Sequence, residues 1–245
     1  MDTVLESPVC LEHSERMARW TCTRCGRFAC DTCVNVQRVC HSCVTRQLLT
    51  LSSSSPRARW TIRFLFANVV TDALSALAGV WTLLVGPSEL RDAAEGLAGF
   101  GACGLTLATP IAFLMWLHLA VRQTQTLGID VGVTPGWAVG CWFIPFWNLV
   151  KPYRVIRELL GGLGGAALVG TAHVGLWWCF WLAAHVQWKN QTEVSNNGHV
   201  EIFISNETYV VAILAKLASV VSAILCVRII RAAQQTLDAK RLTSS

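Results

Sequence analysis

Four long apolar segments constrain the fold of this chain more than any other feature. They cover residues 60–85, 96–121, 164–186 and 209–230. Each is long enough to cross a bilayer as a helix, which takes about 20 apolar residues. The chain is 53% hydrophobic and only 14% charged, whereas a soluble domain carries about 25% charged residues. The sequence therefore predicts an all-α membrane protein with four transmembrane helices.

The distribution of Lys and Arg predicts the orientation of these segments. Basic residues concentrate before residue 60, in the connection of residues 122–157 and near the C-terminus. Cytoplasmic loops carry an excess of Lys and Arg. We therefore expect both termini in the cytoplasm, with a transmembrane domain in residues 60–232 and a cytoplasmic tail in residues 233–245.

The segment of residues 135–159, between the second and third apolar segments, does not suit a complete crossing. Pro145 and Pro152 interrupt any helix there, because proline removes a backbone donor and clashes with the preceding turn. Residues 137–144 would span only about 12 Å as a helix, less than half of a ~30 Å hydrocarbon core. We expect the segment either to be re-entrant, dipping into the membrane and returning, or to lie in the interface.

Aromatic, glycine and proline residues give this segment a distinctive pattern. Its members are Pro135, Gly136, Trp137, Gly140, Trp142, Phe143, Pro145, Asn148, Leu149, Pro152, Tyr153, Glu158 and Leu159. The pattern resembles that of a bacterial membrane family described as domain of unknown function 4328, with Cys141 where the family has Trp and Trp147 where it has a smaller residue. The resemblance covers roughly residues 60–245. It implies a multi-helix fold in the bacterial inner membrane and no assigned activity.

Seven of the eleven cysteines lie between Cys10 and Cys43, in a pattern typical of metal sites. Four pairs of metal-binding residues, each with two residues between its members, are Cys10 and His13, Cys22 and Cys25, Cys30 and Cys33, and Cys40 and Cys43. The two-residue gap lets both side chains of a pair reach one ion, and eight ligands suffice for two tetrahedral zinc sites. The sequence therefore predicts a zinc-binding domain in residues 1–49, with two Zn²⁺ per chain.

The spacing of the pairs resembles the B-box and related cross-brace zinc fingers. In that arrangement the first pair shares an ion with the third, and the second pair with the fourth. The resemblance implies one site of Cys10, His13, Cys30 and Cys33 and another of Cys22, Cys25, Cys40 and Cys43. His41, adjacent to Cys40, is an alternative ligand for the second site. A domain this small has little core, so metal binding would supply its folding energy.

Other interpretations of this domain remain open. Cysteine pairs with this spacing also occur as redox-active motifs, and disulfides would need an oxidising compartment, which the predicted topology does not provide. Arginines in the domain are interspersed with Glu12, Glu15 and Asp31, which disfavours nucleic-acid binding. We expect the partners to be the lipid bilayer and an unidentified cytoplasmic protein.

Two further stretches carry structural expectations. Residues 50–59 (TLSSSSPRAR) predict a flexible linker, because serines are well solvated and Pro56 stops a helix from running through. Small residues recur every four positions at Ala94, Ala98 and Ala102, and at Gly162, Ala166 and Gly170. That spacing allows close helix contact in lipid, either within the bundle or in a homo-oligomer.

Three ionisable residues lie at similar depth within the apolar segments: Asp72, His173 and Lys216. Charges inside a membrane are costly and are usually paired in the bundle interior. We therefore expect an ion pair between Asp72 and Lys216, with His173 nearby. Such a cluster serves either as a buried strut that fixes helix register or as a proton or ion relay.

The sequence contains no catalytic motif that we recognise, so we expect no enzyme activity. The leading hypothesis is a four-helix membrane anchor that presents a cytoplasmic zinc module to a protein partner, as a scaffold or sensor. The alternative is a small transporter or channel component that uses the broken central segment and the midplane charges. A third hypothesis is a membrane-bound thiol redox protein.

Overall fold

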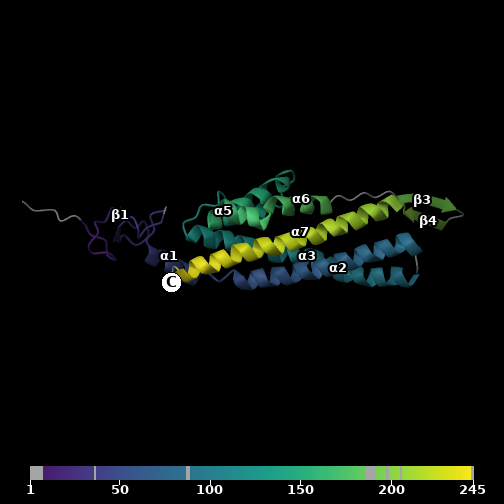
Figure 1. The fold of residues 1–245 in the computed structure, drawn as a ribbon, viewed down its shortest axis with the longest axis horizontal. Helices are drawn as coiled ribbons and strands as arrows, with labels where there is room; N and C mark the ends of the chain where they lie inside the picture. Colours follow the sequence, from purple (N-terminus) through teal and green to yellow (C-terminus); the bar gives the residue numbers. More distant parts are fainter. Residues whose placement is uncertain are drawn as a thin grey trace, which may run out of the picture.

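The computed structural model of the protein describes residues 8–35, 37–86, 89–185, 191–196, 199–204 and 206–243. A small cysteine-rich head lies at one end of an elongated helical bundle (Figure 1). The head contains the two-residue strands β1 (Trp20–Thr21) and β2 (Phe28–Ala29), which pair antiparallel, and the helix α1 (His41–Thr50). We call the end of the bundle beside the head the head end, and the opposite end the distal end.

Three long helices form the frame of the bundle. They are α2 (Ser55–Val85), α3 (Glu89–Thr126) and α7 (Asn206–Thr243). With a rise of 1.5 Å per residue, the 38-residue α7 is about 57 Å long and exceeds a ~30 Å hydrocarbon core. These helices therefore extend beyond the part of the bundle that a membrane would cover.

Four helical stretches are long and apolar enough to cross a membrane, which confirms the predicted class. By length and composition these candidates are Ser55–Val85, Cys103–Thr126, Lys151–Ala172 and Glu207–Leu242. The chain runs along α2 to the distal end, returns along α3, and returns a second time along α7, so that its C-terminal end lies beside α1 (Figure 1). An unexpected hairpin of β3 (Gln191–Asn196) and β4 (His199–Ile204) lies at the distal end.

The central segment enters the bundle from the head end. It contains the short helix α4 (Pro135–Gly140) and the 3₁₀ turn η1 (Trp147–Leu149). The carbonyl of Pro135 lies 3.1 Å from His118 Nδ1, and the ring of Trp142 lies 5.5 Å from that of Phe113. Because α3 runs toward the head end, these contacts place Trp142 deeper in the bundle than Pro135.

The first half of α5 (Lys151–Ala172) then returns to the head end. Its Glu158 lies beside Gly132, and a Cβ placed on Gly162 would be only 2.5 Å from Ile129 Cγ2. Both neighbours belong to the connection that follows α3. The segment therefore enters and leaves the bundle at the same end, as a re-entrant element does.

The third crossing differs from the continuous span expected over residues 164–186. Gly164 and Gly165 have non-helical backbone angles (φ −143° and 70°), and the chain reverses there inside α5. Indole Nε1 of Trp178 donates to the Leu149 carbonyl at 2.9 Å, which shows that the chain after the turn runs back along the chain before it. The crossing therefore comprises residues 166–184.

This crossing is itself interrupted at His173. That residue has the left-handed angles φ 55° and ψ 43°, and it separates the end of α5 from α6 (Val174–Ala184). Residues 166–184 would span about 28 Å if fully helical, close to a ~30 Å core. The expectation of one continuous helix is thus corrected to two helical pieces joined by a break.

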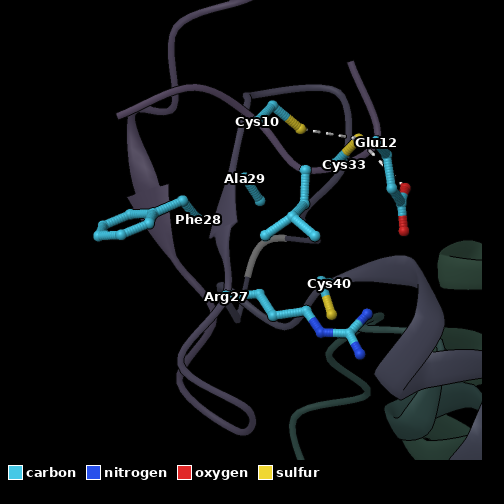
Figure 2. A pocket seen from close by; sticks show the side chains of 8 residues that line it. Cys10, Glu12, Arg27, Phe28, Ala29, Cys33 and Cys40 are labelled. Atoms are coloured by element: carbon cyan, nitrogen blue, oxygen red, sulfur yellow. Dashed lines mark hydrogen bonds between the residues drawn. The ribbon is translucent and has the colours of Figure 1, made fainter. Parts of the chain in front are cut away.

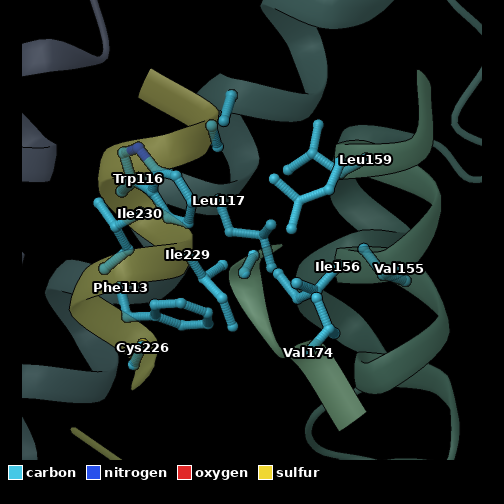
Figure 3. Packing of buried hydrophobic residues seen from close by; sticks show 14 of the residues in the cluster. Phe113, Trp116, Leu117, Val155, Ile156, Leu159, Val174, Cys226, Ile229 and Ile230 are labelled. Carbon is cyan, nitrogen blue, oxygen red and sulfur yellow. The ribbon is translucent and has the colours of Figure 1, made fainter. Parts of the chain in front are cut away.

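The largest buried core lies in the head-end half of the bundle, where the re-entrant segment packs against α3 and α7 (Figure 3). Its fully or almost fully buried side chains include Trp116, Leu117, Ile156, Leu159, Ile229 and Ile230. The distal half instead exposes apolar side chains such as Leu77 (66%) and Leu84 (79%). In a bilayer these side chains would face lipid, which the apolar composition of the segment permits.

The structure also corrects the prediction of a flexible linker in residues 50–59. Helix α2 begins at Ser55, with Pro56 in its first turn, where its missing N–H is tolerated. Ser54 is completely buried and Leu51 is 9% exposed. The head is therefore joined to the bundle through a packed junction.

Candidate metal centre

The first cluster joins Cys10, His13, Cys30 and Cys33. One ligand atom from each lies within 4.8 Å of all the others. The Sγ atoms of Cys10 and Cys33 are 3.8 Å apart, and His13 Nδ1 lies 3.1 Å from Cys33 Sγ. In a tetrahedral site with Zn–S distances of about 2.3 Å, two sulfurs are about 3.8 Å apart. The cluster therefore has the dimensions of a metal site.

The second cluster joins Cys22, Cys25, Cys40 and Cys43 within the same limit of 4.8 Å. The Sγ atoms of Cys25 and Cys40 are 3.7 Å apart. His41 is not a member of this cluster and lies beside it, at a surface depression near Glu12. The structure thus brings together the same two sets of four residues that the resemblance to cross-brace fingers implied.

Tight turns position each pair of ligands. The N–H of Cys33 donates to the Cys30 carbonyl, and the N–H of Cys43 donates to the Cys40 carbonyl, both at 3.0 Å. These turns place the two side chains of a pair on the same side of the backbone. Gly26, with φ 72°, follows the Cys22–Cys25 turn in a conformation that glycine adopts without strain.

The second cluster is attached directly to helix α1. Cys40 is the N-cap residue of this helix and Cys43 lies in its first turn. The N–H of Cys40 also donates to Cys22 Sγ at 3.3 Å. A hydrogen bond of this kind stabilises a ligating thiolate and orients it.

The ionisation of the thiols differs within each cluster. Burial raises the pKa of Cys33 and Cys43 to about 12, and hydrogen bonds with neighbouring cysteines add to this effect. A hydrogen bond from Thr32 instead lowers the pKa of Cys30 to about 6. Burial opposes ionisation of Cys22, but backbone N–H groups outweigh it and lower its pKa to about 6. A divalent cation would remove this asymmetry, because metal ligation requires thiolates.

The predicted intramembrane pair is present in the structure. Lys216 Nζ donates to Asp72 Oδ1 at 2.8 Å, and Ser219 Oγ donates to Asp72 Oδ2 at 2.6 Å. Ser219, three residues from Lys216 on α7, was not predicted, although that spacing on a helix places both residues near one face. Asn68 on α2 donates to Thr109 on α3 at 2.5 Å. A polar row therefore crosses the three long helices.

His173 does not join this pair, which corrects the prediction of a three-residue cluster. Its Nδ1 lies 2.7 Å from the Gly170 carbonyl, and its exposed ring lies at the break between α5 and α6. The neighbouring Thr171 carbonyl accepts from Arg228, which lies about 18 Å along α7 from Lys216. His173 was expected at the depth of Asp72 and Lys216 by counting residues along each apolar segment. That count does not apply to the third crossing, because this crossing is not a continuous helix.

Trp142 is the packing centre of the predicted family motif. Its ring makes edge-to-face contacts with Phe113, Trp178 and Trp181 at 5.5 to 6.1 Å. Its buried Nε1 has no hydrogen-bond partner among the described residues. Trp142 thus holds the re-entrant segment against α3 and α6.

The other motif residues shape the backbone around Trp142. Gly140 ends α4, the Pro145 carbonyl accepts from the N–H of Trp147, and the N–H of Asn148 donates to the Ile144 carbonyl. Pro152 is buried in the first turn of α5, and Tyr153 packs partly buried against the core. Trp137 meets Trp147 edge to face at 6.1 Å, and Phe143 is 73% exposed.

These features define a helical membrane protein whose head carries two Cys/His clusters able to bind metal ions. No curated protein and no solved structure matches this chain. The chain belongs to the family described as Domain of unknown function (DUF4328), whose family model matches residues 87–235, more than half of the chain. The matched region contains the re-entrant segment and begins after α2, so it is shorter than the expected range of residues 60–245.

Proposed function

We propose that this protein is a non-enzymatic membrane anchor that presents a zinc-binding head to a cytoplasmic protein. The observation that carries the proposal is the pair of four-ligand clusters at one end of the bundle. Sets of four Cys or three Cys and one His are typical of closed structural zinc sites, which leave no position open for a substrate. The first ligand pair shares a cluster with the third, and the second pair shares one with the fourth. This arrangement supports assigning the head to the B-box-like cross-brace class.

A cytoplasmic head in the bacterial inner membrane fits the distribution of charge. Arg57 and Arg59 lie in the first turns of α2, and Lys240 and Arg241 lie in the last turn of α7, so basic residues gather at the head end of both helices. Such a bias favours the cytoplasmic side. The cytoplasm keeps thiols reduced. All eleven cysteines lie unpaired in the described part of the chain, as zinc binding in a reducing compartment requires.

An exposed apolar surface on the head supports a protein partner. Val9 and Met17 form a β-bridge, and the N–H of Leu11 donates to the Phe28 carbonyl, so these residues are neighbours. Leu11 is 69% exposed and Met17 65%. A cavity of about 160 Å³ adjoins Leu11 and Phe28, between the two clusters (Figure 2). It is large enough for one apolar side chain.

Charge around this cavity indicates the chemistry of the partner. Arg27 lines the cavity, and its guanidinium has no hydrogen-bond partner in the part of the chain that the structure describes. Nearby carboxylates are already engaged, since Glu12 accepts from Ser42 at 2.6 Å and Asp31 pairs with Arg19. The surface therefore suits a protein segment that carries an apolar side chain beside acidic residues.

The metal content is the first test. Protein purified in detergent under reducing conditions should contain about two zinc ions per chain by plasma mass spectrometry. A metal-free protein whose thiols oxidise reversibly in pairs would contradict the zinc proposal and favour thiol redox chemistry.

The partner surface needs a separate test. A photo-crosslinking amino acid at Phe28 would identify neighbours in native membranes, and the captured protein would then be purified and titrated against the full chain. We expect Leu11→Ser and Arg27→Glu each to weaken binding at least tenfold with zinc content unchanged. Leu49→Ser is the matched control, since Leu49 is equally exposed (69%) on α1. Equal affinities for all three variants would contradict this surface.

A second candidate function, a small transporter or channel component, has support from a different observation. Asp72 and Lys216 lie within membrane-spanning helices, and the chain contains a re-entrant segment. Broken segments and intramembrane charges mark substrate pathways in some transporters. Deleting residues 1–50 should abolish partner binding but spare any flux, whereas Asp72→Asn should abolish flux but spare partner binding.

A further inference from the structure

We propose that the metal state of the second cluster controls the packing of the head-end part of the membrane helices, through helix α1. The inference rests on the proposed metal binding and goes beyond partner recognition. Under this proposal, metal binding in the head stabilises the packing of the membrane domain.

The first link runs from the cluster into α1. Cys40 caps this helix and Cys43 lies in its first turn, so two of the four ligands belong to its N-terminus. The helix has only ten residues. Isolated helices shorter than about 12 residues are marginal in water. Without an ion at Cys40 and Cys43, α1 loses the anchor at its N-terminal end.

The second link runs from α1 to the end of α7. Arg241 donates to the carbonyls of Leu48 and Leu51, at 2.9 and 3.1 Å. These carbonyls lie at the C-terminal end of α1, where helical carbonyls lack partners within the helix. Arg241 can satisfy both only while α1 is formed and in place.

The third link is a buried polar network at the start of α2. Ser54 Oγ lies 2.7 Å from Gln123 Oε1 and 2.9 Å from Gln234 Oε1, while Gln123 Nε2 donates to the Ser52 carbonyl at 2.9 Å. Trp116 Nε1 donates to Gln234 at 3.2 Å. Ser54, Gln123 and Gln234 are 0%, 5% and 8% exposed. The network joins the residues after α1 to both α3 and α7.

Breaking this network would cost free energy unless water replaced the lost hydrogen bonds, because buried polar groups must keep partners. When α1 is fixed, the chain from Leu51 to Ser54 is held in register and the network is complete. When α1 loosens, Ser52 and Ser54 move away from Gln123 and Gln234, and the two glutamines become exposed to water. The metal state therefore changes the packing of α3 and α7, because Gln123 lies on α3 and Gln234 on α7.

Coupling between two sites is reciprocal, which gives the experiment its design. If the second cluster stabilises the junction, then weakening the junction must weaken metal binding at that cluster. The full chain in lipid nanodiscs, loaded with zinc, would be challenged with a chelator while zinc release is followed. We expect Arg241→Gln to release one of the two zinc ions at least threefold faster than the wild type. Arg59→Gln is the matched control, since Arg59 is exposed on α2 near the same junction.

Hydrogen exchange on the same samples would test the forward direction. In Cys43→Ser we expect amides of residues 48–58 and of the last turns of α3 and α7 to exchange at least tenfold faster. Unchanged exchange together with equal zinc release from Arg241→Gln, Arg59→Gln and the wild type would overturn the proposal. Wild-type protein that binds no zinc would instead overturn the proposed metal binding on which this inference rests. The zinc content, measured before the chelator is added, distinguishes the two failures.

Discussion

Lys216 Nζ lies 2.8 Å from Asp72 Oδ1, and this ion pair joins α7 to α2 within the membrane-spanning part of the bundle. Asp72 lies about 14 Å along α2 from Arg63, which stacks on Trp60. That distance is about half of a ~30 Å hydrocarbon core. The pair therefore lies near the middle of the bilayer if Arg63 marks the head-side interface.

Removing one member of this pair should destabilise the protein more than removing both. Asp72→Leu leaves an uncompensated ammonium at this depth, and we expect a loss of about 1–3 kcal/mol in the free energy of unfolding. The double variant Asp72→Leu with Lys216→Leu should recover most of it. Thermal unfolding in nanodiscs measures both, with Ser75→Ala on the same helix as control. Additive losses in the double variant would show that the pair does not contribute as a unit.

His13 and His41 should differ in their effect on metal content. His13 Nδ1 lies 3.1 Å from Cys33 Sγ, whereas His41 is absent from both clusters. We expect His13→Ala to lower the zinc content from two ions to about one, and His41→Ala to leave it at two. Plasma mass spectrometry on the purified variants decides this. Loss of zinc from His41→Ala would instead show that His41 replaces a cysteine in the second site.

Zinc binding should release protons and should weaken as the pH falls. Burial raises the pKa of Cys33 and Cys43 to about 12, so in the metal-free protein these thiols are protonated at pH 7. The metal-bound state holds thiolates and thus fewer protons, so its stabilisation is greatest at high pH and is lost on acidification. Below pH 6, protonation of Cys22 and Cys30, with pKa values of about 6, steepens the loss. Titration calorimetry in buffers of different ionisation enthalpy counts the protons, and a count of zero contradicts this.

The reversal inside α5 should depend on glycine at one position. Gly165 has φ 70° and ψ −167°, a region that side chains other than glycine rarely adopt, and a Cβ there would meet no atom within 4 Å. Gly165→Ala should therefore cost about 1–3 kcal/mol through backbone strain alone. Gly161→Ala is the matched control, since Gly161 is helical and should gain up to about 1 kcal/mol. Thermal unfolding that shifts equally in the two variants would contradict a turn at Gly165.

The head could be anticipated from the sequence because its chemistry is local. Each pair, such as Cys22 and Cys25, is separated by the gap that a shared ion requires, so the ligands are recognisable without knowledge of the fold. The long helices were predictable for a similar reason, since hydropathy is summed over neighbouring residues. The Asp72–Lys216 pair followed from depth alone, because α2 and α7 are both continuous.

The third crossing and the junction could not be anticipated, for two physical reasons. Four of the five residues 161–165 are glycine, which favours a turn, but the apolar residues on both sides suit an uninterrupted membrane helix equally well. The junction joins Ser54 to Gln234, whose serine and glutamine side chains give no sign of burial. Only the approach of α1, α3 and α7 makes them partners.

The contact between Arg241 and α1 also determines the order in which this protein can be completed. The head precedes all of the long helices in the chain, so it is synthesised before them. Leu48 and Leu51 nevertheless meet Arg241 only after α7 has been translated and inserted. The junction therefore closes last, and a chain that lacks α7 leaves Ser54 without its contact to Gln234.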